Sequence, residues 1–301
     1  MSTYYLNADT GDNANAGSSA SPWETLAYAY DNSSADDTLY CQTSTSTYDW
    51  VTDTIANRTI TGQSATGVVF DGADTVVKWS ISGTINLNYI TFQNETKGAG
   101  TFSSPFSGAD AHTFTVTGCI FEDIDNGTHI NGSGIIYSNA DAFGGNQCTT
   151  TFNSCIFDDV LSTTGKTGYE QGIFNLINPP AASTLSLYNC VINQTESTGL
   201  PDNIFVATSN GNEWSMFFQN NIFYNSTGVT VKLCNSYGGA NPKIPVLLDH
   251  NTYYTNYSMS DTDYDVTNTN NITTDPKFVD VGSSDFRLQQ DSPCIDTGTV
   301  I

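Results

Sequence analysis

A short alternating phrase recurs six times between residues 90 and 255, and this repeat constrains the fold more than any other sequence feature. Ile90-Thr-Phe92 is the first copy and Asn251-Thr-Tyr253 the last. The last residue of each phrase follows the preceding one by 29, 36, 35, 31 and 30 residues. These anchor residues are Phe92, Phe121, Phe157, Ile192, Phe223 and Tyr253. Such regular intervals indicate repeated units that each pack on the next.

Each unit consists of alternating strands joined by a one-residue bend. A second set of apolar residues precedes the phrase at a fixed offset, and a third strand follows it near Gly134, Gly172, Asn203 and Val229. Three short strands per turn predict an all-β fold, a parallel β-helix whose stacked coils share one core. An α-helical solenoid is disfavoured because Val, Ile, Phe and Thr alternate. The bend positions carry Tyr89, Gly118, Ser154, Asn189, Asn220 and His250, most of which tolerate a left-handed backbone.

The repeat predicts one domain over residues 1–301, with an N-terminal cap (1–36), coils (37–258) and a closing segment (259–301). In the cap, Ser21-Pro22-Trp23-Glu24 has the pattern of a capping box, so a short helix is expected from Pro22. Its apolar face would carry Trp23, Leu26, Ala27 and Tyr30. That face would cover the open end of the core, whose exposed strands would otherwise aggregate.

Charge composition limits the partners of this chain. It has 31 Asp and Glu against 8 Lys and Arg, a net charge of −23. Because so few basic residues cannot neutralise the phosphates of a nucleic acid, no nucleic-acid partner is expected. No run of about 18 apolar residues is present, so no membrane insertion is expected. The start of the chain shows no basic and apolar export signal.

Both ends of the chain resemble the pectate-lyase-like superfamily of right-handed parallel β-helix proteins. The similar segments are Tyr4–Tyr30, Thr274–Asp280 and Asp291–Gly298. The resemblance implies a right-handed parallel β-helix over essentially the whole chain. It does not imply one activity, because the fold hosts lyases, hydrolases, epimerases, adhesins and phage spikes. Lyases of the superfamily use a Lys or Arg base beside calcium-binding carboxylates. Lys232 is the best-placed base here, but paired basic residues are lacking.

Two pairs of acids are candidate catalytic residues. Glu122 and Asp158 occupy equivalent positions in successive coils, as do Asp123 and Asp159. Stacking would bring each pair to about 5 Å, a separation suited to glycoside hydrolysis. Other interpretations stay open: all four follow an inward Phe at the start of a turn, where acids are ordinary, and they could also bind calcium.

A second acidic motif and a cysteine column raise further alternatives. Asp261, Asp263 and Asp265 alternate as in a calcium loop, but the glycine and distal Glu of an EF-hand are missing. A solvated loop is therefore favoured, and calcium is the one cofactor considered. Cys119 and its counterparts Cys155 and Cys190 would stack within disulfide range. Small inward-facing core residues are the favoured reading of this column.

The function that the sequence favours is a non-enzymatic structural or adhesive β-helix on the surface of a viral particle. A phage head decoration, fibre or tailspike fits the missing export signal and the lack of a convincing catalytic cluster. The expected partners are other proteins of the particle or a surface glycan, and the expected location is the virion surface. The alternatives are a polysaccharide-degrading enzyme, either hydrolase or lyase, and a bacterial adhesin, both extracellular or at the cell surface.

A β-branched outer stripe makes self-association possible. It comprises Thr91, Ile120, Ile156, Val191, Ile222 and Thr252. If exposed, this stripe would be long enough for an interface, such as that of a homotrimer. Covering by the protein's own loops is the alternative.

Overall fold

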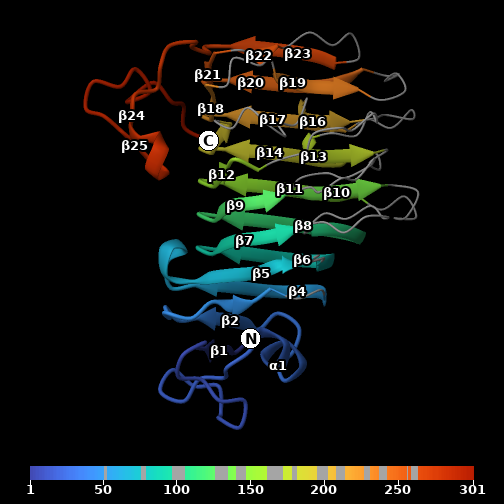
Figure 1. The fold of residues 1–301 in the computed structure, drawn as a ribbon. Helices are drawn as coiled ribbons and strands as arrows, with labels where there is room; N and C mark the ends of the chain where they lie inside the picture. Colours follow the sequence, from blue (N-terminus) through green and yellow to red (C-terminus); the bar gives the residue numbers. More distant parts are fainter. Residues whose placement is uncertain are drawn as a thin grey trace.

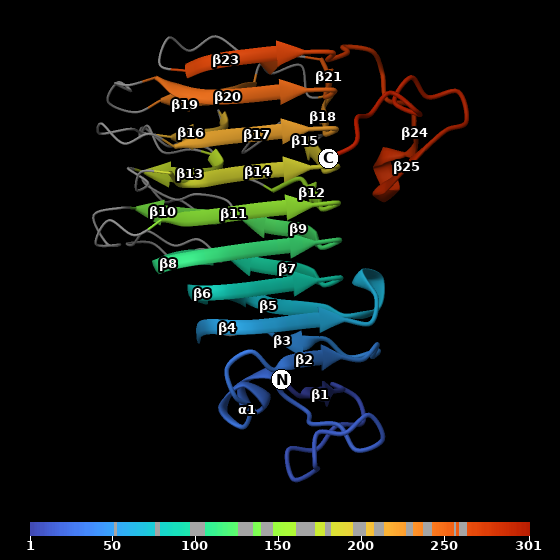
Figure 2. The same cartoon turned by 180° about the vertical axis from the view of Figure 1, so that it is seen from behind.

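Parallel strands stack in successive coils along the length of the molecule, with the N-terminus at one end (Figures 1 and 2). This computed structural model describes residues 1–301 apart from thirteen segments. Those segments are 51–52, 76–78, 97–105, 126–134, 140–146, 161–171, 178–181, 195–202, 208–213, 227–230, 237–242, 256 and 259–263. The prediction of an all-β parallel β-helix is confirmed.

The recurring phrase forms an eight-stranded sheet in which every neighbouring pair is parallel. The predicted register is confirmed: Phe121 pairs with Phe92 on one side and Phe157 on the other. These rings are fully buried. The strands are β3 (Tyr48–Asp49), β5 (Val69–Thr75), β7 (Thr91–Thr96), β9 (Ile120–Asp125), β12 (Ile156–Asp158), β15 (Val191–Gln194), β18 (Ile222–Asn225) and β21 (Thr252–Tyr254).

Fifteen of the remaining strands form a second sheet that forks at β8 (Phe106–Thr117). The first coils contribute β1 (Thr3–Leu6), β2 (Thr38–Cys41), β4 (Asp53–Gly62) and β6 (Trp79–Asn88). The start of β8 pairs with β10 and its end with β11, so one long strand becomes two. One arm is β11 (Cys148–Asn153), β14 (Thr184–Tyr188), β17 (Ser215–Gln219), β20 (Ile244–Asp249) and β23 (Tyr264–Thr269). The other is β10 (Ile136–Asn139), β13 (Gly172–Ile177), β16 (Asn203–Ala207), β19 (Val231–Ser236) and β22 (Tyr257–Ser258), the predicted third strand.

The bend column is confirmed at every predicted position. Tyr89, Gly118, Ser154, Asn189, Asn220 and His250 all have positive φ, between 53° and 62°. Each bend N–H donates to a carbonyl of the next coil, as Gly118 N does to Asn153 O at 2.9 Å. A Cβ at Gly118 would lie 2.6 Å from the Tyr89 ring, so this bend requires glycine for space as well as conformation.

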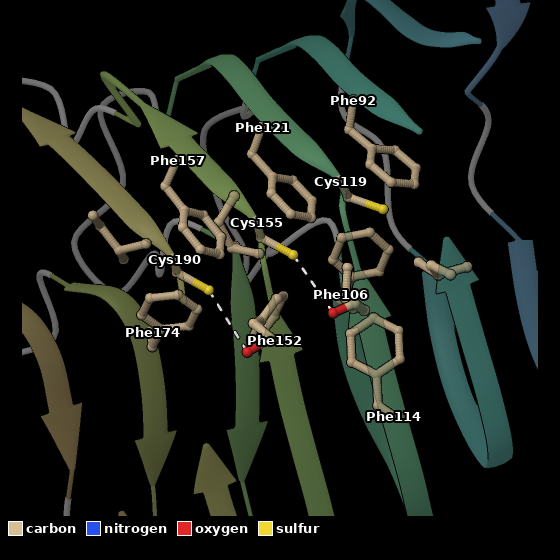
Figure 3. Packing of buried hydrophobic residues seen from close by; sticks show 14 of the residues in the cluster. Phe92, Phe106, Phe114, Cys119, Phe121, Phe152, Cys155, Phe157, Phe174 and Cys190 are labelled. Carbon is tan, nitrogen blue, oxygen red and sulfur yellow. Dashed lines mark hydrogen bonds between the residues drawn. The ribbon is translucent and has the colours of Figure 1, made fainter. Parts of the chain in front are cut away.

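One buried column directly follows the bends, and it holds cysteines in three successive coils and asparagines in the next two. The Sγ atoms of Cys155 and Cys190 lie 3.5 and 3.6 Å from carbonyl oxygens of the preceding coil (Figure 3). In the next coils Asn221 and Asn251 take over, and each donates its side-chain amide to the equivalent carbonyl. The cysteines of the column are free and buried, so the core interpretation is confirmed over disulfide bonding.

The N-terminal cap differs from the prediction at its helix. α1 spans Leu26–Asp31, and its N-cap is Thr25, whose side chain accepts from Tyr28 N. The expected start at Pro22 is wrong because Trp23 is held in extended backbone, where it bridges to Leu6 and donates its N–H to Tyr5 O. The buried residues of α1 are Leu26 and Ala29, whereas Ala27 is exposed. No helix within the described residues reaches the length and apolarity of a membrane span.

The closing segment first adds β23 to the end of the stack and then folds back along its flank (Figures 1 and 2). It contains β24 (Phe278–Asp280), the 3-10 turn η3 (Val281–Ser283) and β25 (Asp285–Leu288), with β24 and β25 antiparallel. Phe278 packs against Tyr224 of β18 at a ring-centroid distance of 5.5 Å. We call residues 276–292 the C-terminal hairpin. It lies against the outer face of the eight-stranded sheet, which positions it beside the acidic residues described next.

Candidate functional site

The four predicted acids meet at the outer face of β9 and β12. Glu122 pairs with Asp158 in register, one strand apart, so their Cα atoms are separated by about 5 Å. Asp123 and Asp159 follow directly and have φ of 51° and 42°. Asp123 lies within β9, which continues to Asp125, whereas Asp159 comes directly after the end of β12. The four carboxyl groups line one cavity of about 290 Å³ with Val281, Gly282 and Ser284 of the C-terminal hairpin.

Asp158 is the most constrained of these acids. Asn193, in the next coil, donates its Nδ2 to Asp158 Oδ1 at 2.6 Å. Ser284 donates its hydroxyl to Asp158 Oδ2 at 2.5 Å from a position 126 residues later in the chain. Both oxygens of Asp158 are therefore oriented by donors, and the side chain is buried beneath the hairpin. Asn193 is 1% exposed, and its own Oδ1 has no hydrogen-bond partner.

Electrostatics favour retention of a proton at this site. Burial raises the pKa of Glu122, and the neighbouring charges of Asp123 and Asp158 raise it further. Burial also raises the pKa of Asp158, while the donors Ser284 and Asn193 act in the opposite direction. The two carboxyls thus share a negative, partly desolvated environment in which they differ in hydrogen bonding. Such a difference separates an acid role from a base or nucleophile role.

A polar column continues from Glu122 toward the N-terminal coils. Glu122 pairs with Gln93, which in turn pairs with Asp71. Gln93 Nε2 and Asn94 Nδ2 both donate to Asp71 Oδ2 at 3.0 Å. Burial alone would raise the pKa of Asp71, but these donors and the Ala73 N–H outweigh it and hold the pKa below its usual range. The ionised carboxylate of Asp71 is therefore a half-exposed hydrogen-bond acceptor two coils from Glu122.

No described basic residue lies in the acidic cavity. Arg58 is buried over the ring of Tyr30 at 4.7 Å, and Lys277 and Arg287 pair with acids of their own hairpin. The backbone of Lys232 is described within β19, but its side chain lies outside the described residues. Within the described residues, the arrangement thus offers carboxyls without the Lys or Arg base of a lyase.

The loop with the alternating acids is described only in part. Asp261 and Asp263 lie outside the described residues, and Asp265 is exposed on β23. Among the residues that the structure describes, no group of three or more His, Cys, Asp or Glu side chains is arranged to hold a metal. Calcium binding stays the untested alternative to a solvated loop.

The β-branched stripe is partly covered by the protein itself. The end of the chain lines a cavity of about 580 Å³ with Val191, Ile222 and Thr252. Cys294 Sγ lies 3.2 Å from Thr252 Oγ1, and Thr299 exchanges two hydrogen bonds with Asn220. Covering by the chain's own residues therefore occurs at these three positions, and the homotrimer stays a prediction.

Sequence reasoning found the four acids and missed their partners. Asn193 was detectable, because it occupies the repeat position of Glu122 and Asp158. The same position in earlier coils holds Asp71 and Gln93. Ser284 carried no such signal, because it belongs to the hairpin and not to the repeat.

Known proteins are similar to this chain in structure and not detectably in sequence. No family model matches the sequence, and no curated protein matches it. A rhamnogalacturonan lyase structure aligns with 94% of this chain and 92% of its own, at 12% identity and a TM-score of 0.46. A GH136 lacto-N-biosidase from Eubacterium ramulus aligns with 91% of this chain and 68% of its own, at 9% identity and a TM-score of 0.41. An alginate lyase of the PL6 family aligns with 82% of this chain and 46% of its own, at 10% identity and a TM-score of 0.22.

These comparisons correct the function favoured by the sequence. The prediction of a non-enzymatic viral surface protein is wrong, because the similar structures are two polysaccharide lyases and a glycoside hydrolase, with no link to a phage particle. At these identities the likeness concerns the fold, so any catalytic assignment depends on the residues of this chain.

Proposed function

We propose that this protein is a polysaccharide-degrading enzyme that hydrolyses glycosidic bonds with Glu122 and Asp158. The observation that carries the proposal is the pairing of two partly desolvated carboxyls in register on neighbouring strands. Their Cα atoms are about 5 Å apart, a strand spacing that allows the separation of about 5–5.5 Å between carboxyl groups found in glycosidases that retain anomeric configuration. The proposed partner is thus a glycan, and such substrates place the enzyme outside the cell or at a cell surface.

Glu122 fits the role of proton donor. Burial and the nearby carboxylates raise its pKa, so the protonated form persists to higher pH than in a free glutamate. The protonated carboxyl would transfer its proton to the glycosidic oxygen as the bond to the anomeric carbon breaks. The resulting Glu122 carboxylate then accepts a proton from the water that completes hydrolysis.

Asp158 fits the role of nucleophile. The donors Asn193 and Ser284 occupy one acceptor site on each oxygen, and each carboxylate oxygen has two. A lone pair therefore remains to attack the anomeric carbon and form a glycosyl ester. Water then breaks this ester and restores the free carboxylate. The same two donors stabilise the carboxylate as the leaving group in that second step.

Hydrolysis is favoured over a lyase reaction by the lining of the cavity. A lyase needs a base that removes a carbon-bound proton next to a carboxyl group of the sugar, and a cation that stabilises the resulting charge. The described lining supplies four acids and no cation. A uronate substrate would add another negative charge to this site, which like-charge repulsion opposes.

A panel assay tests the proposal. The protein is incubated with arabinoxylan, galactan, xyloglucan, polygalacturonate, rhamnogalacturonan and alginate, and new reducing ends are measured alongside the ultraviolet absorbance of unsaturated products. We expect reducing ends without unsaturated products on at least one neutral glycan. Unsaturated products would contradict the hydrolase assignment, and absence of cleavage across the panel would contradict an enzymatic function.

A further inference from the structure

We infer that the C-terminal hairpin is an end wall of the substrate site, so that the enzyme removes short units from chain ends rather than cutting internally. This inference rests on the proposed function and adds a mode of action to it. In an unobstructed β-helix, the outer face of a sheet runs past every coil, and a long glycan could lie along it in both directions. Here one direction is occupied by the protein's own chain.

The wall begins immediately beside the paired acids. Ser284 binds Asp158 of β12, and Phe278 packs on Tyr224 of β18, two strands farther along. Asn193, on the intervening β15, is 1% exposed. The outer face is therefore buried at Asp158 and Asn193 and partly covered at Tyr224 of β18. Figures 1 and 2 show the hairpin against this part of the stack from both sides.

The wall is a packed element with its own internal contacts. Phe278 is 6% exposed and contacts Phe286 within the hairpin at 5.3 Å. Gln289 donates its backbone N–H to Lys277 O and its side-chain amide to Phe278 O. Lys277 pairs with Asp291 at 2.6 Å. A substrate would have to displace these contacts in order to continue past Asp158.

The opposite direction offers groups that bind sugar hydroxyls. Glu122, Gln93 and Asp71 follow one another on β9, β7 and β5, and all three are half-exposed. Amides and carboxylates are the polar groups that fix hydroxyl-bearing ligands. On the side of the wall, Asn193 is buried and its amide binds Asp158, so it holds the acid in place instead of contacting the glycan. A glycan end would thus meet the wall while the rest of the glycan follows the half-exposed column of Glu122, Gln93 and Asp71.

The products of cleavage decide between the two modes. An oligosaccharide of defined length, taken from a glycan that the panel assay identifies, is cleaved and followed by mass spectrometry over time. We expect one short product from the first time point, together with the correspondingly shortened chain. Reducing ends should accumulate while the viscosity of the parent polymer falls only slowly. A complete series of intermediate lengths, with a rapid fall in viscosity, would overturn the inference.

A variant pair links this behaviour to the wall. Phe278→Ala removes the packing against Tyr224, and we expect it to add products of intermediate length. Val279→Ala is the matched control, because Val279 is 47% exposed on the same strand. An unchanged product pattern in a folded Phe278→Ala variant would contradict the wall. If instead no panel glycan is cleaved, the proposed function itself is wrong, so the two failures are distinguishable.

Discussion

The hydroxyl of Ser284 donates to Oδ2 of Asp158, so the closing segment contacts the acidic pair directly. Ser284 adopts a left-handed backbone, with φ of 53° and ψ of 29°, and its N–H bonds Val281 O. A non-glycine residue in this conformation is uncommon and is retained when surrounding contacts favour it. The turn η3 thus presents the hydroxyl to an acid of the stacked coils.

Removal of this donor should change the pH dependence of cleavage. Ser284→Ala deletes a hydrogen bond that lowers the pKa of Asp158, so this pKa, already raised by burial, should rise further. Asp158 must be ionised to attack, so the acidic limb of the pH–rate profile should move to higher pH. We expect activity below the optimum to fall about tenfold, as for a lost hydrogen bond to a charged group.

A neighbouring serine provides the control for that profile. Ser283 Oγ donates to Asp280 at 3.0 Å, and both residues are exposed. Ser283→Ala should leave the acidic limb in place. If Ser284→Ala also leaves it in place in a folded protein, Ser284 does not tune Asp158.

The raised pKa of Glu122 predicts a pH-dependent stability difference. Because the folded-state pKa lies above the ordinary value of 4.5, the folded state favours the protonated carboxyl. That contribution to stability is complete below pH 4.5 and is lost as the pH rises through the raised pKa. Glu122→Gln should therefore melt about 2 °C higher than the parent protein at pH 7. The difference should vanish near pH 4, and a variant that melts lower at pH 7 would contradict this electrostatic account.

The asparagine column should contribute strongly to stability. Asn251 is fully buried, donates to Phe218 O at 2.7 Å and accepts from Asn221 N at 2.9 Å. Asn251→Ala leaves two buried backbone groups without partners and should lower the free energy of unfolding by about 3 kcal/mol, measured in urea. Asn86, which bonds Thr59 at a half-exposed position, is the control. Equal losses in Asn251→Ala and Asn86→Ala would contradict the column's role.

The free thiols should differ in reactivity. Burial raises the pKa of Cys148 to about 11 and raises that of Cys119 and Cys190 well above the ordinary range. In a Cys234→Ser background, a thiol reagent should modify the half-buried Cys294 first. The other thiols should react only after unfolding. Rapid modification of several thiols in the native protein would contradict the packing of the column.

Much of the stack was predictable because each coil repeats the same physical requirement. The rings of Phe92, Phe121 and Phe157 are fully buried, and they stack on one another only when their strands pair in this register. The repeat interval and the alternation of apolar residues therefore predict the register together. The left-handed bends were predictable from residue type at Gly118 and Asn189 and from column position at Tyr89.

The misplaced helix start and the missed site contacts have different causes. Ser21-Pro22-Trp23-Glu24 satisfies a local capping pattern, but Trp23 stacks on Tyr4 at 4.7 Å and pairs with Leu6, and these tertiary contacts prevail over local propensity. The repeat predicted the acid pair, but it did not predict the C-terminal hairpin that covers Asp158. Ser284 reaches Asp158 through a fold-back of the non-repeating end, which no periodicity specifies.

The central claim is tested most directly by comparing Glu122→Gln and Asp158→Asn with the parent protein on the glycan that the panel identifies. Glu24→Gln, an exposed change in the N-terminal cap, is the control for the loss of one acid. Loss of a positioned general acid or nucleophile should lower kcat at least about 100-fold. We predict that both site variants lose this much reducing-end release, with unchanged folding by circular dichroism, while Glu24→Gln keeps full activity. Retention of parental activity by either folded site variant would contradict the account.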